Sequence, residues 1–177
     1  MRAAGVLVLL GALAACGTPP PPPARLPPAA RQLESDPVRA AIRGAADAFA
    51  YPESLAGQPQ QAATAVAQLE FLAVEIMAGR TSVNLSGIVG PALQAARSEV
   101  RDYLGVPESA PPQAVIDALS ATPPNLSQPA LFPTGAAETL RRLSAMPRLP
   151  QANTGTAVAR QEMEFGPPSE FDVVRLR

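Results

Sequence analysis

The sequence predicts an all-α fold, a compact bundle of five to six helices that follows a signal peptide and a disordered proline-rich tether. The composition is 47% hydrophobic but only 4% aromatic, without Trp, and much of its apolar content is alanine. Alanine favours helices, whereas sheets favour β-branched and aromatic residues. In addition, prolines and glycines divide residues 36–166 into segments of helical length with apolar side chains at helical spacing.

The first two helices have clear boundaries in the sequence. Asp36 followed by Pro37 predicts an N-cap and a first helical turn, and Tyr51-Pro52 predicts the end of that helix. A second helix is expected over residues 59–78, with Gly79 as its stop. This second helix is apolar around most of its circumference, which predicts a central position in the bundle. Its polar residues form only a narrow stripe: Gln61, Thr64, Gln68 and Glu75.

Four shorter or less regular helices are predicted downstream. The third covers residues 86–104, unless Gly90-Pro91 marks its start, and the fourth follows Pro111-Pro112. A loop over 122–135 then places its two large apolar side chains inward, and a fifth helix covers 136–146. The remaining expectations are a sixth helix over 152–164 and a C-terminal tail over 167–177, in which residues 171–174 either dock as an extended strand or stay loose. The inward side chains of the loop are Leu131 and Phe132, and those of the fifth helix are Leu140, Leu143 and Met146.

The first residues have the proportions of a signal peptide. Arg2 is followed by the apolar stretch Ala3–Leu13, which is too short for a membrane span of about 20 residues. The tetrad Leu13-Ala14-Ala15-Cys16 resembles the lipobox of bacterial lipoproteins. An ordinary secretory signal prefers a small residue at the position that Leu13 occupies, three before the cut. The resemblance implies cleavage after residue 15, a diacylglyceryl group on the Cys16 thiol, and in many cases acylation of the new amine.

Residues 16–35 are expected to form the tether. Pro19–Pro23, Pro27 and Pro28 exclude helix and central strand, and polyproline II extends about 3.1 Å per residue, so the segment after Cys16 would reach roughly 60 Å. A spacer is the main interpretation, and a ligand for a proline-binding partner is the alternative. The resemblance also bears on sorting. In enteric lipoproteins Asp after the cysteine retains the protein in the inner membrane, so Gly17 favours the periplasmic face of the outer membrane.

Several classes of chemistry are excluded by composition. The chain has no His and no Lys, and its single cysteine is assigned to lipid, which excludes His-dependent triads, lysine Schiff bases and the usual zinc ligands. No cofactor or catalytic residue is therefore predicted. The precursor carries a net charge of −1 and no basic stripe, so nucleic-acid binding is not expected. Glu99 with Asp102, and Glu162 with Glu164, are interpreted as ordinary solvated acids.

Glu70 departs from the pattern of its helix. On a helical wheel it lies between Val66 and Val74, away from the polar stripe, so we expect it to be buried. A buried carboxylate needs a partner or takes a raised pKa. Arg97, beside the apolar seam of the third helix, is the first candidate partner for a structural ion pair, and Arg43 is the second.

These features favour a membrane-anchored, non-enzymatic envelope lipoprotein whose helical module binds a protein partner. Two alternatives are weighed. Alanine-rich helices can enclose a cavity for a small apolar ligand or lipid. A carboxylate-dependent cell-wall hydrolase would instead need two acids about 5–9.5 Å apart in a cleft, for which the sequence gives no sign.

Overall fold

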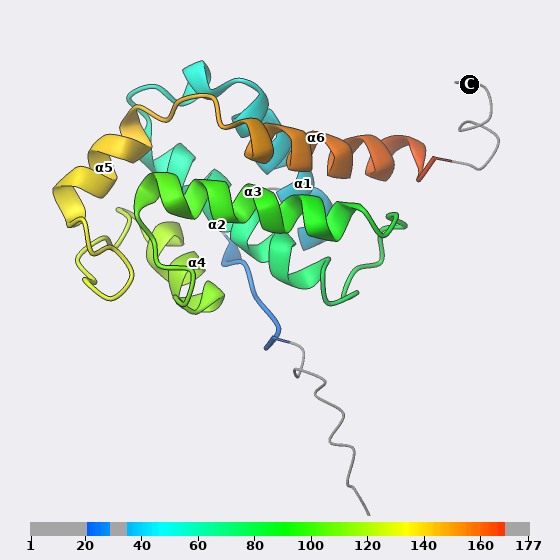
Figure 1. The fold of residues 1–177 in the computed structure, drawn as a ribbon, viewed down its shortest axis with the longest axis horizontal. Helices are drawn as coiled ribbons and strands as arrows, with labels where there is room; N and C mark the ends of the chain where they lie inside the picture. The colour runs from blue at the N-terminus through cyan, green and yellow to red at the C-terminus, as the bar shows by residue number, and fades with distance from the viewer. Residues whose placement is uncertain (1–20, 29–34, 169–177) are drawn as a thin grey trace, which may run out of the picture.

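The computed structural model describes residues 21–28 and 35–168, and these residues form a helical bundle without strands (Figure 1). The predicted all-α fold is confirmed. The signal sequence, Cys16 and residues 169–177, including the tail segment 171–174, lie outside the described residues. The elements are α1 (Pro37–Ala50), the 3-10 turn η2 (Pro52–Leu55), α2 (Pro59–Glu75), α3 (Val89–Leu104), α4 (Pro112–Ser120), α5 (Ala136–Ser144) and α6 (Pro150–Phe165).

Most of these helices begin with proline. Proline has no backbone N–H, and an N–H in the first turn of a helix would have no intrahelical partner. At α1 the predicted cap is present: the Asp36 carboxylate accepts a hydrogen bond of 2.8 Å from the Val38 N–H. The last helix begins at Pro150, before the expected residue 152, for the same reason. α2 ends at Glu75 and continues to Gly79 only as irregular turns, so the predicted end at residue 78 was too late.

α2 occupies the centre of the bundle, as its apolar circumference predicted, and packs against α1, α3, α4 and α5. Leu69 and Leu72 are fully buried. Two residues of the polar stripe of α2, Gln68 and Glu75, are buried. Gln68 is buried because its amide lies directly against Gly44 of α1, where a Cβ would clash with it, and Glu75 is buried beneath the N-terminal segment.

α3 and α6 run side by side and make the most extensive helix pair (Figure 1). Their close approach depends on Gly155, because a Cβ at this position would lie 2.7 Å from the Ala92 carbonyl oxygen. A second contact joins the same helices: Glu99 of α3 accepts a hydrogen bond of 2.9 Å from the Ala152 N–H. That N–H belongs to the first turn of α6, where donors have no intrahelical partner.

α5 lies at the edge of the bundle, and only one side of it is covered. Leu143 is buried, but Leu140, which was expected to face inward, is 43% exposed. Met146 is buried beyond the end of the helix, which stops at Ser144. Glu138 forms ion pairs with Arg141 and Arg142, with a shortest distance of 2.7 Å to each, and these two arginines lower the pKa of Glu138 to about 2. In the preceding loop, Leu131 and Phe132 are buried as predicted.

Residues 21–28 pack on the domain, so the disorder expected for the whole tether does not extend to them. Leu26 is 1% exposed and joins the core. The Ala24 N–H donates to Glu75 at 2.7 Å, and the Gln113 side-chain amide bonds both the N–H and the carbonyl of Arg25, at 2.7 and 3.1 Å. Between its prolines, this segment has an apolar side chain and backbone N–H and C=O groups that can bond to the domain. The prolines restrict the segment to an extended conformation before it packs.

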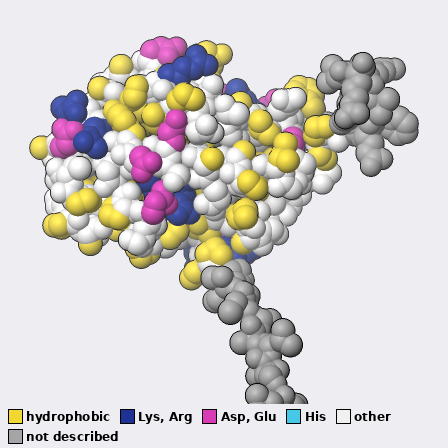
Figure 2. Space-filling view, in the orientation of Figure 1, with side chains coloured by type: hydrophobic (Ala, Val, Ile, Leu, Met, Phe, Trp, Pro, Cys, Tyr) yellow, Lys and Arg dark blue, Asp and Glu magenta, His cyan; other side chains and the backbone are white. Residues whose placement is uncertain are grey.

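Charged side chains on the face shown in Figure 2 form small mixed groups rather than one patch of a single sign. Within residues 21–28 and 35–168, none of the helices combines the length and hydropathy required to span a bilayer.

Candidate functional site

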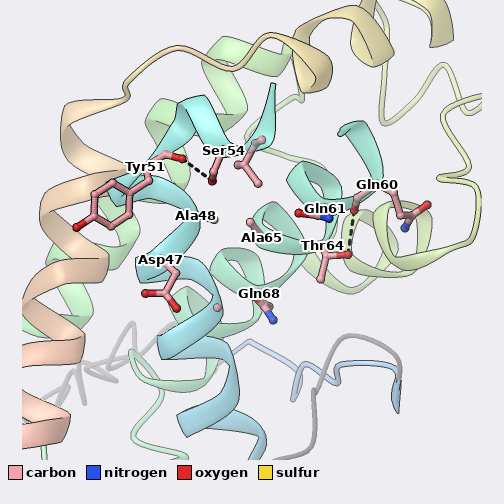
Figure 3. A pocket seen from close by; sticks show the side chains of 11 residues that line it. Asp47, Ala48, Tyr51, Ser54, Gln60, Gln61, Thr64, Ala65 and Gln68 are labelled. Atoms are coloured by element: carbon pink, nitrogen blue, oxygen red, sulfur yellow. Dashed lines mark hydrogen bonds between the residues drawn. The ribbon is translucent and has the colours of Figure 1, made fainter. Parts of the chain in front are cut away.

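An open groove with a volume of about 690 Å³ lies between the C-terminal half of α1, η2 and the N-terminal half of α2 (Figure 3). Small residues create it: Gly44, Ala48 and Ala65 let the two helices approach and leave the space between longer side chains. Tyr51 stands at one end of the groove with 60% of its surface exposed. The volume lies within the range of ligand-binding sites.

The polar side chains that line this groove are mostly uncharged. Gln60, Gln61 and Thr64 contribute from α2, and Ser54 contributes from η2. Some of these groups are already engaged: Thr64 donates to the Gln60 carbonyl at 3.0 Å, and the Gln60 amide donates to the Ala121 carbonyl at 3.1 Å. Amides and hydroxyls both donate and accept hydrogen bonds. The groove therefore offers both donors and acceptors of hydrogen bonds.

One carboxylate, Asp47, lines the groove, and it forms an ion pair with Arg160 of α6. This pair ties the outer side of α1 to the last helix. The sequence did not point to this groove, because its residues come from two helices and a turn whose contact is set by small side chains rather than by a motif.

A second cluster lies in the interior, around the predicted residue Glu70. The Glu70 carboxylate is 2% exposed and receives two hydrogen bonds from Arg101, at 2.5 and 2.8 Å. The remaining guanidinium nitrogen of Arg101 donates to three backbone carbonyls of the loop between α3 and α4. These are the carbonyls of Pro107, Glu108 and Ala110, at 3.0–3.1 Å.

Arg97, the first candidate partner, lies in the same cluster but in a secondary position. Its Nε is 3.7 Å from the Glu70 carboxylate, and its other end reaches Glu108 at 3.6 Å. Arg43, the second candidate, is exposed on α1. Arg101 was not predicted as a partner, although it lies one turn after Arg97 on the same side of α3. The bidentate pair of Glu70 and Arg101, together with the loop carbonyls bound by Arg101, holds α2, α3 and the α3–α4 loop together.

Two further acids that were expected to be solvated also bridge distant segments. Glu162 of α6 is 4% exposed and accepts hydrogen bonds from the N–H and hydroxyl of Ser86, at 2.6 and 2.7 Å. Glu99 caps the start of α6, as described above. These contacts correct the interpretation of Glu99 and Glu162 as ordinary surface acids. The reason is that each carboxylate satisfies backbone donors at a turn or helix start, where such groups lack partners.

Cys16, the predicted lipidation site, lies outside the described residues. Within the described part of the chain, no group of three or more Cys, Asp or Glu side chains is placed to hold a metal ion. No protein-family model, curated protein or solved structure matches this chain.

Proposed function

We propose that this chain is a bacterial envelope lipoprotein, anchored through lipid on Cys16, whose helical domain is a non-enzymatic adaptor for a protein partner. The observation that carries the proposal is the tetrad Leu13-Ala14-Ala15-Cys16 at the end of a short apolar signal segment. Gly17 supports placement at the periplasmic face of the outer membrane. Two or three acyl chains would make the attachment durable, because one chain alone binds only marginally.

The groove between α1 and α2 supports a polypeptide as the partner. Its exposed aromatic, Tyr51, offers apolar area with a polar end, a combination common at protein interfaces. Its glutamines and hydroxyls match the backbone amides of an extended segment. An apolar carrier would be better served by an enclosed cavity than by this open groove. A glycoside hydrolase needs two carboxylates across its cleft, whereas this groove has one, which is paired with Arg160.

The anchor is tested by the variant Cys16→Ser. We expect the wild-type chain in the membrane fraction, with the mass of its N-terminal peptide increased by lipid, and the variant without that increase in mass. The physical reason is that no other part of the proposal supplies acyl chains to hold the protein in a bilayer. Thr18→Ser, two residues away, is the matched control and should fractionate as the wild type does. A wild-type N-terminal peptide without the lipid mass, or a Cys16→Ser peptide that keeps it, would contradict the anchor.

The groove is tested by photo-crosslinking in cells. A photoreactive residue in place of Gln61, which is exposed in the groove, should give one discrete protein adduct. Tyr51→Ala should reduce that adduct strongly, because truncating an aromatic contact often removes a large share of binding energy. The same photoreactive residue at Gln151, exposed at the start of α6, is the control. An identical adduct from both positions, or one that survives Tyr51→Ala, would rule the groove out.

A further inference from the structure

The docked N-terminal segment shortens the chain that separates lipid from protein. Arg80, just after α2, donates to the carbonyls of Pro21 and Pro22 at 3.2 and 3.5 Å, and Ala24 is bonded to Glu75. Only five residues lead from Cys16 to Pro21. Even fully extended, they span at most about 18 Å, compared with the roughly 60 Å of a free tether.

This span is short relative to the domain itself. A domain of this length has a radius of gyration of about 14 Å, which corresponds to a diameter of roughly 36 Å. Because the tether is only half as long as this diameter, only the surface around its attachment point on the domain can reach the membrane. That point lies at the C-terminal end of α2, where residues 21–28 run along the lower side of the molecule in Figure 1.

The surface beside this attachment point carries exposed apolar side chains. Met77, three residues before Arg80, is 55% exposed, and Ile88, in the loop that leads to α3, is 63% exposed. Met77 lines a shallow groove together with Gly87 and Gly90, which lie close to Ile88 in the sequence. Ile88 itself lines a second groove, with Phe165 at the end of α6. Arg25 is also exposed at this end. In Figure 2, hydrophobic and arginine side chains adjoin where the described N-terminal segment reaches the lower edge.

We infer that this surface, formed by Pro21–Pro23, Arg25, Met77 and Ile88, rests on the phospholipid bilayer that holds the lipid of Cys16. The inference depends on the proposed anchor. Met77 and Ile88 enter the boundary between headgroups and acyl chains, where exposed apolar side chains are favoured, and Arg25 meets headgroup phosphates. The groove between α1 and α2 then faces away from the membrane. Along α2, Thr64 lies about 16 Å from Glu75, so the two sites occupy opposite ends of one helix.

The test measures depth with fluorescent labels on the lipidated full-length protein. Met77→Cys and Ile88→Cys each introduce a single free thiol, because the only natural cysteine carries the lipid in this proposal. Leu140→Cys is the matched control, since Leu140 is an exposed apolar residue of α5, whose end meets the N-terminal end of α2 through the Gly57 N–H and the Ser144 carbonyl. The proteins are reconstituted into vesicles of phosphatidylethanolamine and phosphatidylglycerol that contain spin-labelled lipid.

We expect spin-labelled lipid to quench the labels at positions 77 and 88 and to leave the label at position 140 unquenched. Flotation of the vesicles is measured in the same samples. Protein that fails to float with the vesicles would refute the anchor and this inference together. Protein that floats, but whose labels at 77 and 88 are no more quenched than the label at 140, would overturn the inference alone and leave the anchor standing.

Discussion

Glu70→Ala is expected to destabilise the mature chain by about 3–5 kcal/mol, the typical cost of removing one partner of a buried ion pair. The loss is large because Arg101 is 1% exposed and would keep a buried charge without its carboxylate. Urea denaturation followed by circular dichroism measures the effect as a lower midpoint with an unchanged slope. A shift equivalent to less than about 1 kcal/mol would show that the pair does not hold the core together.

Two companion variants separate the roles within this cluster. Arg97→Ala should cost much less than Glu70→Ala, because Arg97 is 3.7 Å from the carboxylate and lies near the surface. The double variant Glu70→Leu with Arg101→Met should recover only part of the loss. Apolar replacement of both partners removes the charge penalty, but the carbonyls of Pro107, Glu108 and Ala110 would still lack their donor.

Gly155→Ala should have the second largest effect, a loss of about 1–3 kcal/mol, and Gly155→Val should exceed it. The added Cβ would meet the Ala92 carbonyl oxygen at 2.7 Å and the Ala96 Cβ at 3.2 Å. Because the first of these atoms is backbone, relief requires α3 and α6 to move apart along their whole contact. Thermal unfolding followed by circular dichroism should therefore show a clearly lower midpoint.

Gly87→Ala is the matched control for this substitution. Gly87 has no atom within 4 Å of an added Cβ and does not have a positive φ. Alanine there should be neutral or slightly stabilising, since it restricts only the unfolded chain. Equal losses from Gly155→Ala and Gly87→Ala would mean that the helix contact tolerates a methyl group and that the effect comes from glycine replacement in general.

The helices of this chain could be predicted because their signals are local. Asp36 with Pro37, Pro59 and Pro112 mark helix starts through the geometry of proline and the need to cap free N–H groups. The central position of α2 also followed from local pattern, since a helix that is apolar on most sides must be covered on most sides. The burial of Glu70 emerged in the same way, from its place on the wheel.

What the sequence did not predict depends on contacts between distant residues. Glu75 with Ala24, Glu99 with Ala152, and Glu162 with Ser86 each join a carboxylate to a backbone N–H far along the chain. Such pairs leave no periodic trace, because the donor is present in every residue except proline. The groove between α1 and α2 is equally hidden, since it arises where Gly44, Ala48 and Ala65 leave volume unfilled.

The two hydrogen bonds between Gln113 and the backbone of Arg25 affect which substitutions this protein can accept during evolution. The Gln113 side chain bonds to the main-chain N–H and carbonyl of Arg25, as a neighbouring strand would. Neither hydrogen bond involves the Arg25 side chain. Substitution of residue 25 by anything but proline therefore leaves both hydrogen bonds available. The domain, through Gln113 and Glu75, therefore fixes the path of the segment without selecting the side chain at position 25.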